Sequence, residues 1–186
     1  MAGACYLMKL FARARMSLIA TGWLFALLRV QAAETSLIPF ELEGHDKQTY
    51  TASSWAGRPL LVFVSTREAA AHNAGRAWSG PVTAAVTGHA ADAVAIRVGT
   101  LPHDVPRLFA SMVRNALEPA SDDPIRIALL DWEGRFAQHY ELDDESYNVL
   151  LFDRDGELVY RVALRDFAQE KLDIVLRDIE ATAGRL

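Results

Sequence analysis

The sequence predicts a layered α/β domain, a mixed central sheet with helices on both faces, from three observations. Short apolar runs alternate with longer stretches of helical periodicity in the order β-α-β-α-β-β-α. The last two strands flank Asp155 and Gly156, a pair typical of tight antiparallel hairpins, which makes the sheet mixed. A hydrophobic content of 51% and a charged content of 23% over 186 residues fit a globular chain and exclude a collagenous or disordered one. We therefore expect a three-layer α/β/α sandwich.

The first 32 residues are organised as a secretory signal peptide. Three basic residues precede an apolar run over 16–28, small residues lead up to Ala32, and the segment contains no acidic residue. The run is shorter than the about 20 residues that a membrane-spanning helix needs. Arg29 lies between the run and the cleavage site, which leaves open an uncleaved amphipathic or membrane-anchoring end. We expect cleavage after Ala32, a single domain over 33–186, and a periplasmic or secreted location.

The charge of the remaining domain excludes two classes of partner. Removing residues 1–32 takes away four of the 19 basic residues and none of the 24 acidic ones, which leaves a net charge of −9. Nucleic acid and anionic lipid headgroups repel such a domain, so we expect no nucleic-acid partner and no stable membrane association after cleavage. The chain's single cysteine, Cys5, lies in the predicted signal, so the exported domain would contain neither a thiol nor a disulfide.

The first half of the domain is predicted to contain four strands and two helices. The run at 60–64 is apolar throughout, as in a strand that is buried on both faces. The alanine-rich helix over 67–78 should be interrupted at Gly80 and Pro81, because proline lacks a backbone N–H, and it can resume over 82–86. The next helix, over 104–117, has apolar residues at helical spacing. Strands are expected at 38–43, 48–51, 60–64 and 93–98, with a helical turn around Trp55.

The second half is predicted to contain three strands and a long final helix. A strand at 125–130 leads through a turn at 131–134 into a short helical turn over 136–142. The strands at 149–152 and 157–162 form the hairpin, whose turn also explains the superficially calcium-loop-like run at 153–157. The last helix should begin at Asp166, with Gln169 as its capping-box partner, and should end near Gly184.

Four segments carry a resemblance to a known superfamily. They are 40–44, 55–64, 128–131 with Gly134 and Tyr140, and, most characteristically, 151–161. In this order and spacing they resemble the thioredoxin-fold superfamily, in its secreted peroxiredoxin-like and TlpA-like branch, over nearly all of the chain after residue 32. Within that superfamily, Tyr147 followed by 148–156 looks most like the YtfJ family of small periplasmic proteins. The resemblance implies a thioredoxin-like sandwich.

The resemblance also implies a position for redox chemistry, and this chain lacks the residues for it. Active members carry a reactive cysteine just after the strand that corresponds to 60–64, near a helix N-terminus that lowers the pKa of the thiol. Here Glu68 and Ala71 stand at the positions of the cysteine pair. Tyr147 or Asn148 stands where the family has a cis-proline facing that pair. Thiol oxidoreductase and peroxidase activities are therefore disfavoured.

Polar residues at this edge of the predicted sheet are the candidate binding residues. They are Ser65, Thr66, Arg67, Glu68 and His72 after the third strand, and Tyr147 and Asn148 on the facing strand. Amides at the helix N-terminus, with Arg67 as counter-charge, could hold a small anion or a carbonyl group. Alternatively, Ser65 or Thr66 caps the helix and Glu68 complements its dipole. We expect Tyr147 to lie beside the segment 67–72 and to fill the groove that the family uses for substrate.

Other polar groups form no recognisable site in the sequence. The five histidines are scattered, with no pair at i and i+4 on a predicted helix, so no metal site and no cofactor are expected. The acidic run over 141–145 is most simply a solvated loop, with a divalent cation or a basic partner as the alternative. Trp132, in the turn at 131–134, could also contact a partner.

Two hypotheses for the function follow. The first is an exported thioredoxin-fold protein without thiol redox chemistry, acting as a binding or interaction module for an unknown protein or small-molecule partner. The alternative is a non-redox enzyme that uses Arg67, Glu68 and His72 at the degenerate active-site edge. The first requires only surface complementarity, whereas the second requires convergent polar groups. We expect the protein to be a binding module rather than an enzyme.

Overall fold

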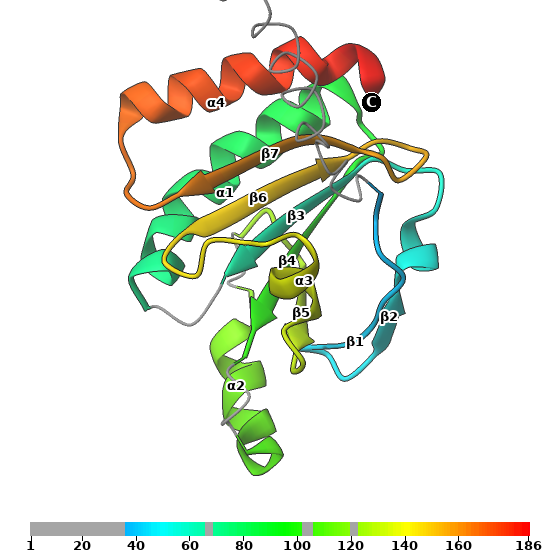
Figure 1. The fold of residues 1–186 in the computed structure, drawn as a ribbon, viewed down its shortest axis with the longest axis vertical. Coiled ribbons are helices and arrows are strands. Elements are labelled where there is room, and N and C mark those ends of the chain that lie inside the picture. Colours follow the sequence, from blue (N-terminus) through cyan, green and yellow to red (C-terminus); the bar gives the residue numbers. More distant parts are fainter. Residues whose placement is uncertain (1–35, 66–68, 102–105, 120–122) are drawn as a thin grey trace, which may run out of the picture. The chain divides into compact units, whose positions relative to one another are not determined.

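The structure, a computed structural model, describes residues 36–65, 69–101, 106–119 and 123–186, with only the backbone at 69–74, 76 and 107. These residues belong to one compact unit, Glu34–Leu186, built on a seven-stranded sheet (Figure 1). The predicted signal peptide, 1–32, lies outside the described residues. The strands are β1 (Glu41–Gly44), β2 (Thr49–Thr51), β3 (Leu60–Ser65), β4 (Val94–Thr100), β5 (Ile127–Asp131), β6 (Tyr147–Phe152) and β7 (Leu158–Leu164). The helices are α1 (Ala69–His89), α2 (Ala110–Leu117), α3 (Arg135–His139) and α4 (Gln169–Thr182).

The sheet is mixed, as predicted. Its strand order is β2-β1-β5-β4-β3-β6-β7. The central strands β3, β4 and β5 are parallel, and every other neighbouring pair is antiparallel. The predicted hairpin joins β6 to β7, and Gly156 in its turn has a φ of +80°, a conformation that glycine adopts without strain. The carboxyl ends of β3 and β4 therefore meet the start of β6 at one edge of the sheet.

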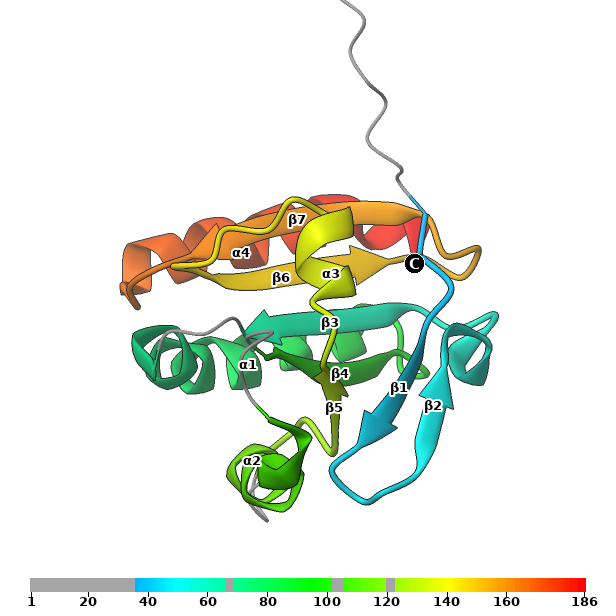
Figure 2. The same ribbon diagram turned by 60° about the horizontal axis from the view of Figure 1, so that its bottom comes forward.

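Helices cover both faces of the sheet, which confirms the predicted α/β/α layering. Helices α1 and α4 pack on the face that carries Leu61 and Phe63 (Figure 1). Helix α3 packs on the opposite face, which carries Val62 and Val64 (Figure 2). Alternate residues of β3 thus enter two different cores, and this is why the run at 60–64 is apolar throughout.

Helix α1 is continuous, so the predicted interruption at Gly80 and Pro81 is wrong. Pro81 lies inside the helix with its ring exposed to solvent. On either side of it, Trp78 and Val82 are fully buried against the sheet. Burial of large side chains before and after the proline holds the helical direction, which offsets the hydrogen bond that Pro81 cannot donate.

Two other helix predictions need correction. The last helix begins at Gln169 rather than at a capping box on Asp166, because β7 extends to Leu164 and the chain is still turning after it. Gln169 instead donates a hydrogen bond to Asp173 (3.0 Å). Helix α2 begins at Ala110 after a 3-10 turn, and residues 102–105 lie outside the described residues. Among the described helices, none combines the length and apolar character needed to cross a membrane.

Candidate functional site

The candidate site lies where β3, β4 and β6 end together at one edge of the sheet. Ser65, the last residue of β3, pairs with Tyr147, the first residue of β6, and with Gly99 of β4. Asn148 pairs with Val64, one position further along. The structure thus brings together three of the predicted binding residues, Ser65, Tyr147 and Asn148, from segments about 80 residues apart in the chain.

Tyr147 fills the space between the sheet and α1. Its side chain is fully buried, and its ring stacks on Phe63 with centroids 5.6 Å apart. The ring also lies directly against the backbone of Gly75 in α1, so that a Cβ at residue 75 would overlap it. Only glycine lets the helix approach the tyrosine this closely. Tyr147 therefore fills the site as a packed ring, with its hydroxyl inside the protein.

The hydroxyl of Tyr147 lies near a buried ion pair. Arg97, on β4, pairs with Asp123 at 2.9 Å, and both side chains are nearly inaccessible to solvent. The positive charge of Arg97 interacts with the tyrosine hydroxyl. Burial raises the pKa of Tyr147 to about 12, although the nearby Arg97 charge opposes the rise. The hydroxyl is therefore neutral at every physiological pH.

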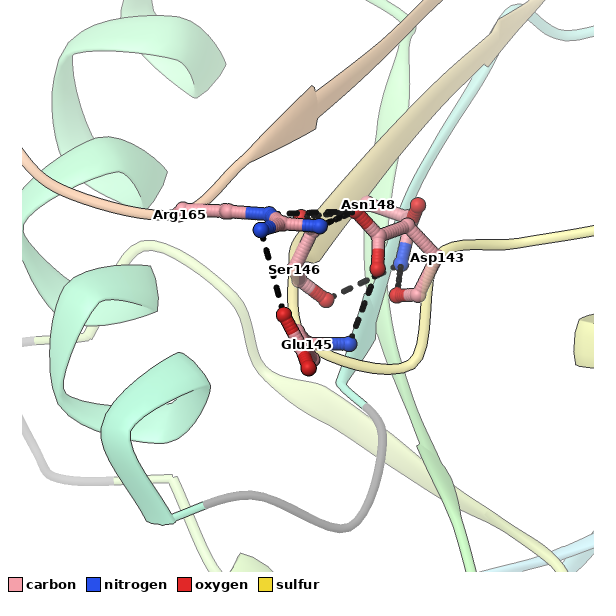
Figure 3. Close-up of polar contacts among 5 residues, drawn as sticks. All are labelled: Asp143, Glu145, Ser146, Asn148 and Arg165. Carbon is pink, nitrogen blue, oxygen red and sulfur yellow. Dashed lines mark hydrogen bonds and ion pairs between the residues drawn. The ribbon is translucent and has the colours of Figure 1, made fainter.

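Asn148 faces the opposite side of the sheet and holds the loop that precedes β6. Its amide donates hydrogen bonds to the carbonyl oxygens of Asp143 and Ser146, each at 3.0 Å (Figure 3). The carboxylate of Asp143 accepts hydrogen bonds from the Ser146 hydroxyl (2.8 Å) and from the backbone N–H of Glu145 (3.0 Å). These hydrogen bonds hold the loop against the start of β6.

Arg165, which directly follows β7, binds two acidic residues of the same loop. It bonds Asp143 at 3.0 Å and pairs with Glu145 at 3.1 Å (Figure 3). Hydrogen bonds from Ser146 and Glu145, together with Arg165, lower the pKa of Asp143. Two members of the predicted acidic run are thus engaged within the protein. Glu145 remains largely exposed and gives the edge a negatively charged rim.

The remaining predicted binding residues have no described side chains. Thr66, Arg67 and Glu68 lie outside the described residues, and His72 is described only as part of the α1 backbone. The contact between Tyr147 and the segment 67–72 therefore stays a prediction. The described contact of Tyr147 with α1 is at Gly75, three residues after His72.

Several residues at this edge were not predicted from the sequence. Arg97 interrupts the apolar strand at 93–98, and a charge inside such a run was the available signal for a buried ion pair. No comparable signal was available for the residues whose partners are distant in the sequence or lie across a loop, namely Asp123, Ser146 and Arg165. Within the described ranges, no group of three His, Cys, Asp or Glu side chains is placed to hold a metal ion.

Sequence comparison identifies no relative, because no protein-family model and no curated protein matches the chain. Solved structures, in contrast, share its fold. The exposed lipoprotein thioredoxin Etrx1 of Streptococcus pneumoniae has a TM-score of 0.56 at 19% identity, covering 77% of this chain and 99% of its own. A putative thiol:disulfide interchange protein DsbE of Chlorobium tepidum has a TM-score of 0.58 at 15% identity, covering 82% and 98%.

A third neighbour belongs to a different group of proteins with the same fold. Copper-bound ScoI of Arabidopsis thaliana has a TM-score of 0.55 at 14% identity, covering 79% of this chain and 99% of its own. The alignments cover nearly all of each neighbour, but the sequence identities are below 20%. Such a similarity shows a shared fold and nothing about function. Together with the mixed sheet flanked by helices, these neighbours show that the chain has the thioredoxin fold.

Proposed function

We propose that the chain is an exported thioredoxin-fold protein of the YtfJ type that performs no thiol redox chemistry and acts as an interaction module in the periplasm or outside the cell. The observation that carries this proposal is the composition of the site. Cys5 is the only cysteine in the chain, and Glu68 and Ala71 stand at the positions of the redox pair. Neither a carboxylate nor a methyl group can attack a disulfide or a peroxide.

The packing at the edge favours a binding role over catalysis in the family's groove. The resemblance gives the cis-proline position to Tyr147 or Asn148; both side chains are buried, and the described residues contain no cis peptide bond. Ser65, Tyr147 and Asn148 are each at least 95% buried, so they position the edge instead of touching a ligand. Ligand contacts would come from Glu145 on the described rim and from the predicted residues Thr66, Arg67, Glu68 and His72.

The redox half of the proposal is tested by insulin reduction and peroxide consumption with the purified protein. We expect turnover indistinguishable from the no-protein background, while thioredoxin assayed beside it reduces insulin. Turnover above that background, in a preparation free of thioredoxin, would refute the proposal.

The binding half is tested by affinity capture from periplasmic extract with matched charge variants. A partner that recognises the edge should be captured by the wild type and lost with Arg67→Glu or Glu145→Lys. It should be kept by Glu180→Lys, which reverses an exposed charge near the end of α4. Capture that is equal with all four proteins would place the interaction elsewhere. The alternative, a non-redox enzyme using Arg67, Glu68 and His72, stays a prediction.

A further inference from the structure

A second surface lies at the other side of the sheet, beyond β4, where β1 and β5 diverge. These strands pair only at Glu43 with Leu130 and Gly44 with Leu129. Past that point they separate around a cavity of about 420 Å³. This volume lies within the range of about 300 to 1,000 Å³ that is typical of ligand-binding pockets. Phe40 and Leu42 line the cavity from the β1 side, and Ala110, the first residue of α2, lines it from the other. Figure 1 shows α2 and the β1–β2 hairpin on either side of the turn that follows β5.

An apolar patch begins at the rim of this cavity. It consists of Leu108, Phe109 and Met112, and we call it the α2 patch. Their exposed fractions are 75%, 43% and 63%, and they are three of the five large hydrophobic residues that are exposed in the described part of the chain. The helix is anchored chiefly through buried Leu117. Leu108 and Phe109 directly precede Ala110, the residue through which this helix lines the cavity.

The cavity rim carries one carboxylate that is unpaired within the described part of the chain. Glu43 is paired with Arg114 at 3.0 Å, and Glu133 is paired with Arg135. Glu41 is exposed and makes no ion pair with the described residues, so it remains as excess negative charge. The carboxylate of Asp131 is buried and accepts two backbone N–H groups of α3, which leaves it unavailable to a ligand.

We propose that the α2 patch and the cavity together bind a partner-protein segment that is basic and carries apolar side chains. The apolar side chains would cover the patch, and a lysine or arginine would pair with Glu41. A second copy of the chain fits poorly, because in a two-fold contact it would bring a second unpaired Glu41 to the interface and no basic partner for the first. The same unpaired carboxylate repels an anionic lipid surface. This inference goes beyond the proposed function, because it requires nothing of the edge at Ser65 and Tyr147.

The test is fluorescence anisotropy with a labelled peptide of alternating lysine and leucine and the full chain. We expect saturable binding, which a peptide of alternating glutamate and leucine does not show. The double variant Leu108→Ser with Met112→Ser should weaken binding about tenfold, because both side chains are exposed and would be covered by the ligand. Glu41→Lys should weaken the lysine peptide and allow the glutamate peptide to bind.

Matched control variants distinguish binding at this surface from nonspecific binding of the peptide elsewhere on the protein. Ile174→Ser removes a 47% exposed apolar side chain from α4, and Glu180→Lys reverses an exposed charge on the same helix. Neither should change the affinity. Equal losses in the controls, or unchanged affinity in the α2 and Glu41 variants, overturn the proposal. The proposal is also overturned if the protein forms a dimer in sedimentation, or binds anionic phosphatidylglycerol vesicles, and the double variant abolishes that dimer or that binding. If the double variant fails to fold, the single exposed change Glu41→Lys decides.

Discussion

The contact between Gly75 and Tyr147 is the tightest constraint on the candidate site at the scale of single residues. Alanine normally stabilises a helix relative to glycine, but a Cβ at residue 75 would overlap the tyrosine ring. We expect Gly75→Ala to lower the free energy of unfolding by about 1 to 3 kcal/mol, because neither the buried ring nor the helix can move freely. Denaturant unfolding followed by circular dichroism measures the change.

The control for this substitution is another glycine of the same helix. Gly88 has nothing within 4 Å of its Cβ position, so Gly88→Ala should raise the free energy of unfolding by about 0.5 kcal/mol. If Gly75→Ala stabilised the protein in the same way, the ring of Tyr147 would not lie against α1.

The buried hydroxyl of Tyr147 predicts a pH dependence in the alkaline range. Its pKa rises from 10.0 to about 12 on folding, so the folded state holds this proton more tightly. The resulting stability is fully present below pH 10 and is lost as the pH rises toward 12. We expect this tyrosine to account for about 1 kcal/mol of the stability lost by pH 11. Tyr147→Phe should remove that loss, because phenylalanine has no hydroxyl to ionise.

Tyr160 provides the comparison for this titration. Its pKa is also raised to about 12, first by burial and then by Asp178, but its side chain is only half-buried. Tyr160→Phe should therefore leave the contribution of Tyr147 in place. Identical alkaline unfolding curves for the wild type and Tyr147→Phe would contradict the assignment.

The start of α1 decides at the scale of elements whether the alignment with redox proteins is correct. If Glu68 and Ala71 occupy the cysteine positions, Glu68→Cys with Ala71→Cys in a Cys5→Ser background should form an intramolecular disulfide. The reduced pair should then support slow insulin reduction, because the helix N-terminus favours thiolate. Mass spectrometry and the insulin assay measure these outcomes.

A second cysteine pair with the same spacing controls for the presence of thiols alone. Ala84→Cys with Thr87→Cys places the pair in the C-terminal part of α1, away from the helix N-terminus. We expect no insulin reduction from it, because the thiols lie far from the helix N-terminus that favours thiolate. Equal behaviour of the two pairs would show that the position of Glu68 and Ala71 is not special.

The N-terminal segment predicts the location of the whole molecule. Charge, apolar run and small residues predict export with cleavage after Ala32. The intact mass of protein recovered from the periplasm should correspond to a chain that begins at Ala33. A recovered product that still contains Trp23 and Arg29 would favour the uncleaved anchor instead.

Features that depend on neighbouring residues were predictable from the sequence. The apolar run at 60–64 identified a strand buried on both faces, and Asp155 with Gly156 identified the β6–β7 hairpin. The order of these elements predicted the mixed sheet. The cysteine count alone disfavoured thiol chemistry, because a domain without a cysteine sulfur has no thiolate nucleophile whatever its fold.

Features that depend on distant partners were decided only by the tertiary structure. Helix α1 continues through Pro81 because burial of Trp78 and Val82 outweighs a local penalty. The ion pair of Arg97 with Asp123 requires β4 and a loop to meet. Periodicity over 104–117 indicated an apolar side, but no element among the described residues covers Leu108, Phe109 and Met112, which are exposed. Local sequence sets which face of an element is apolar, and packing against other elements decides whether that face is covered.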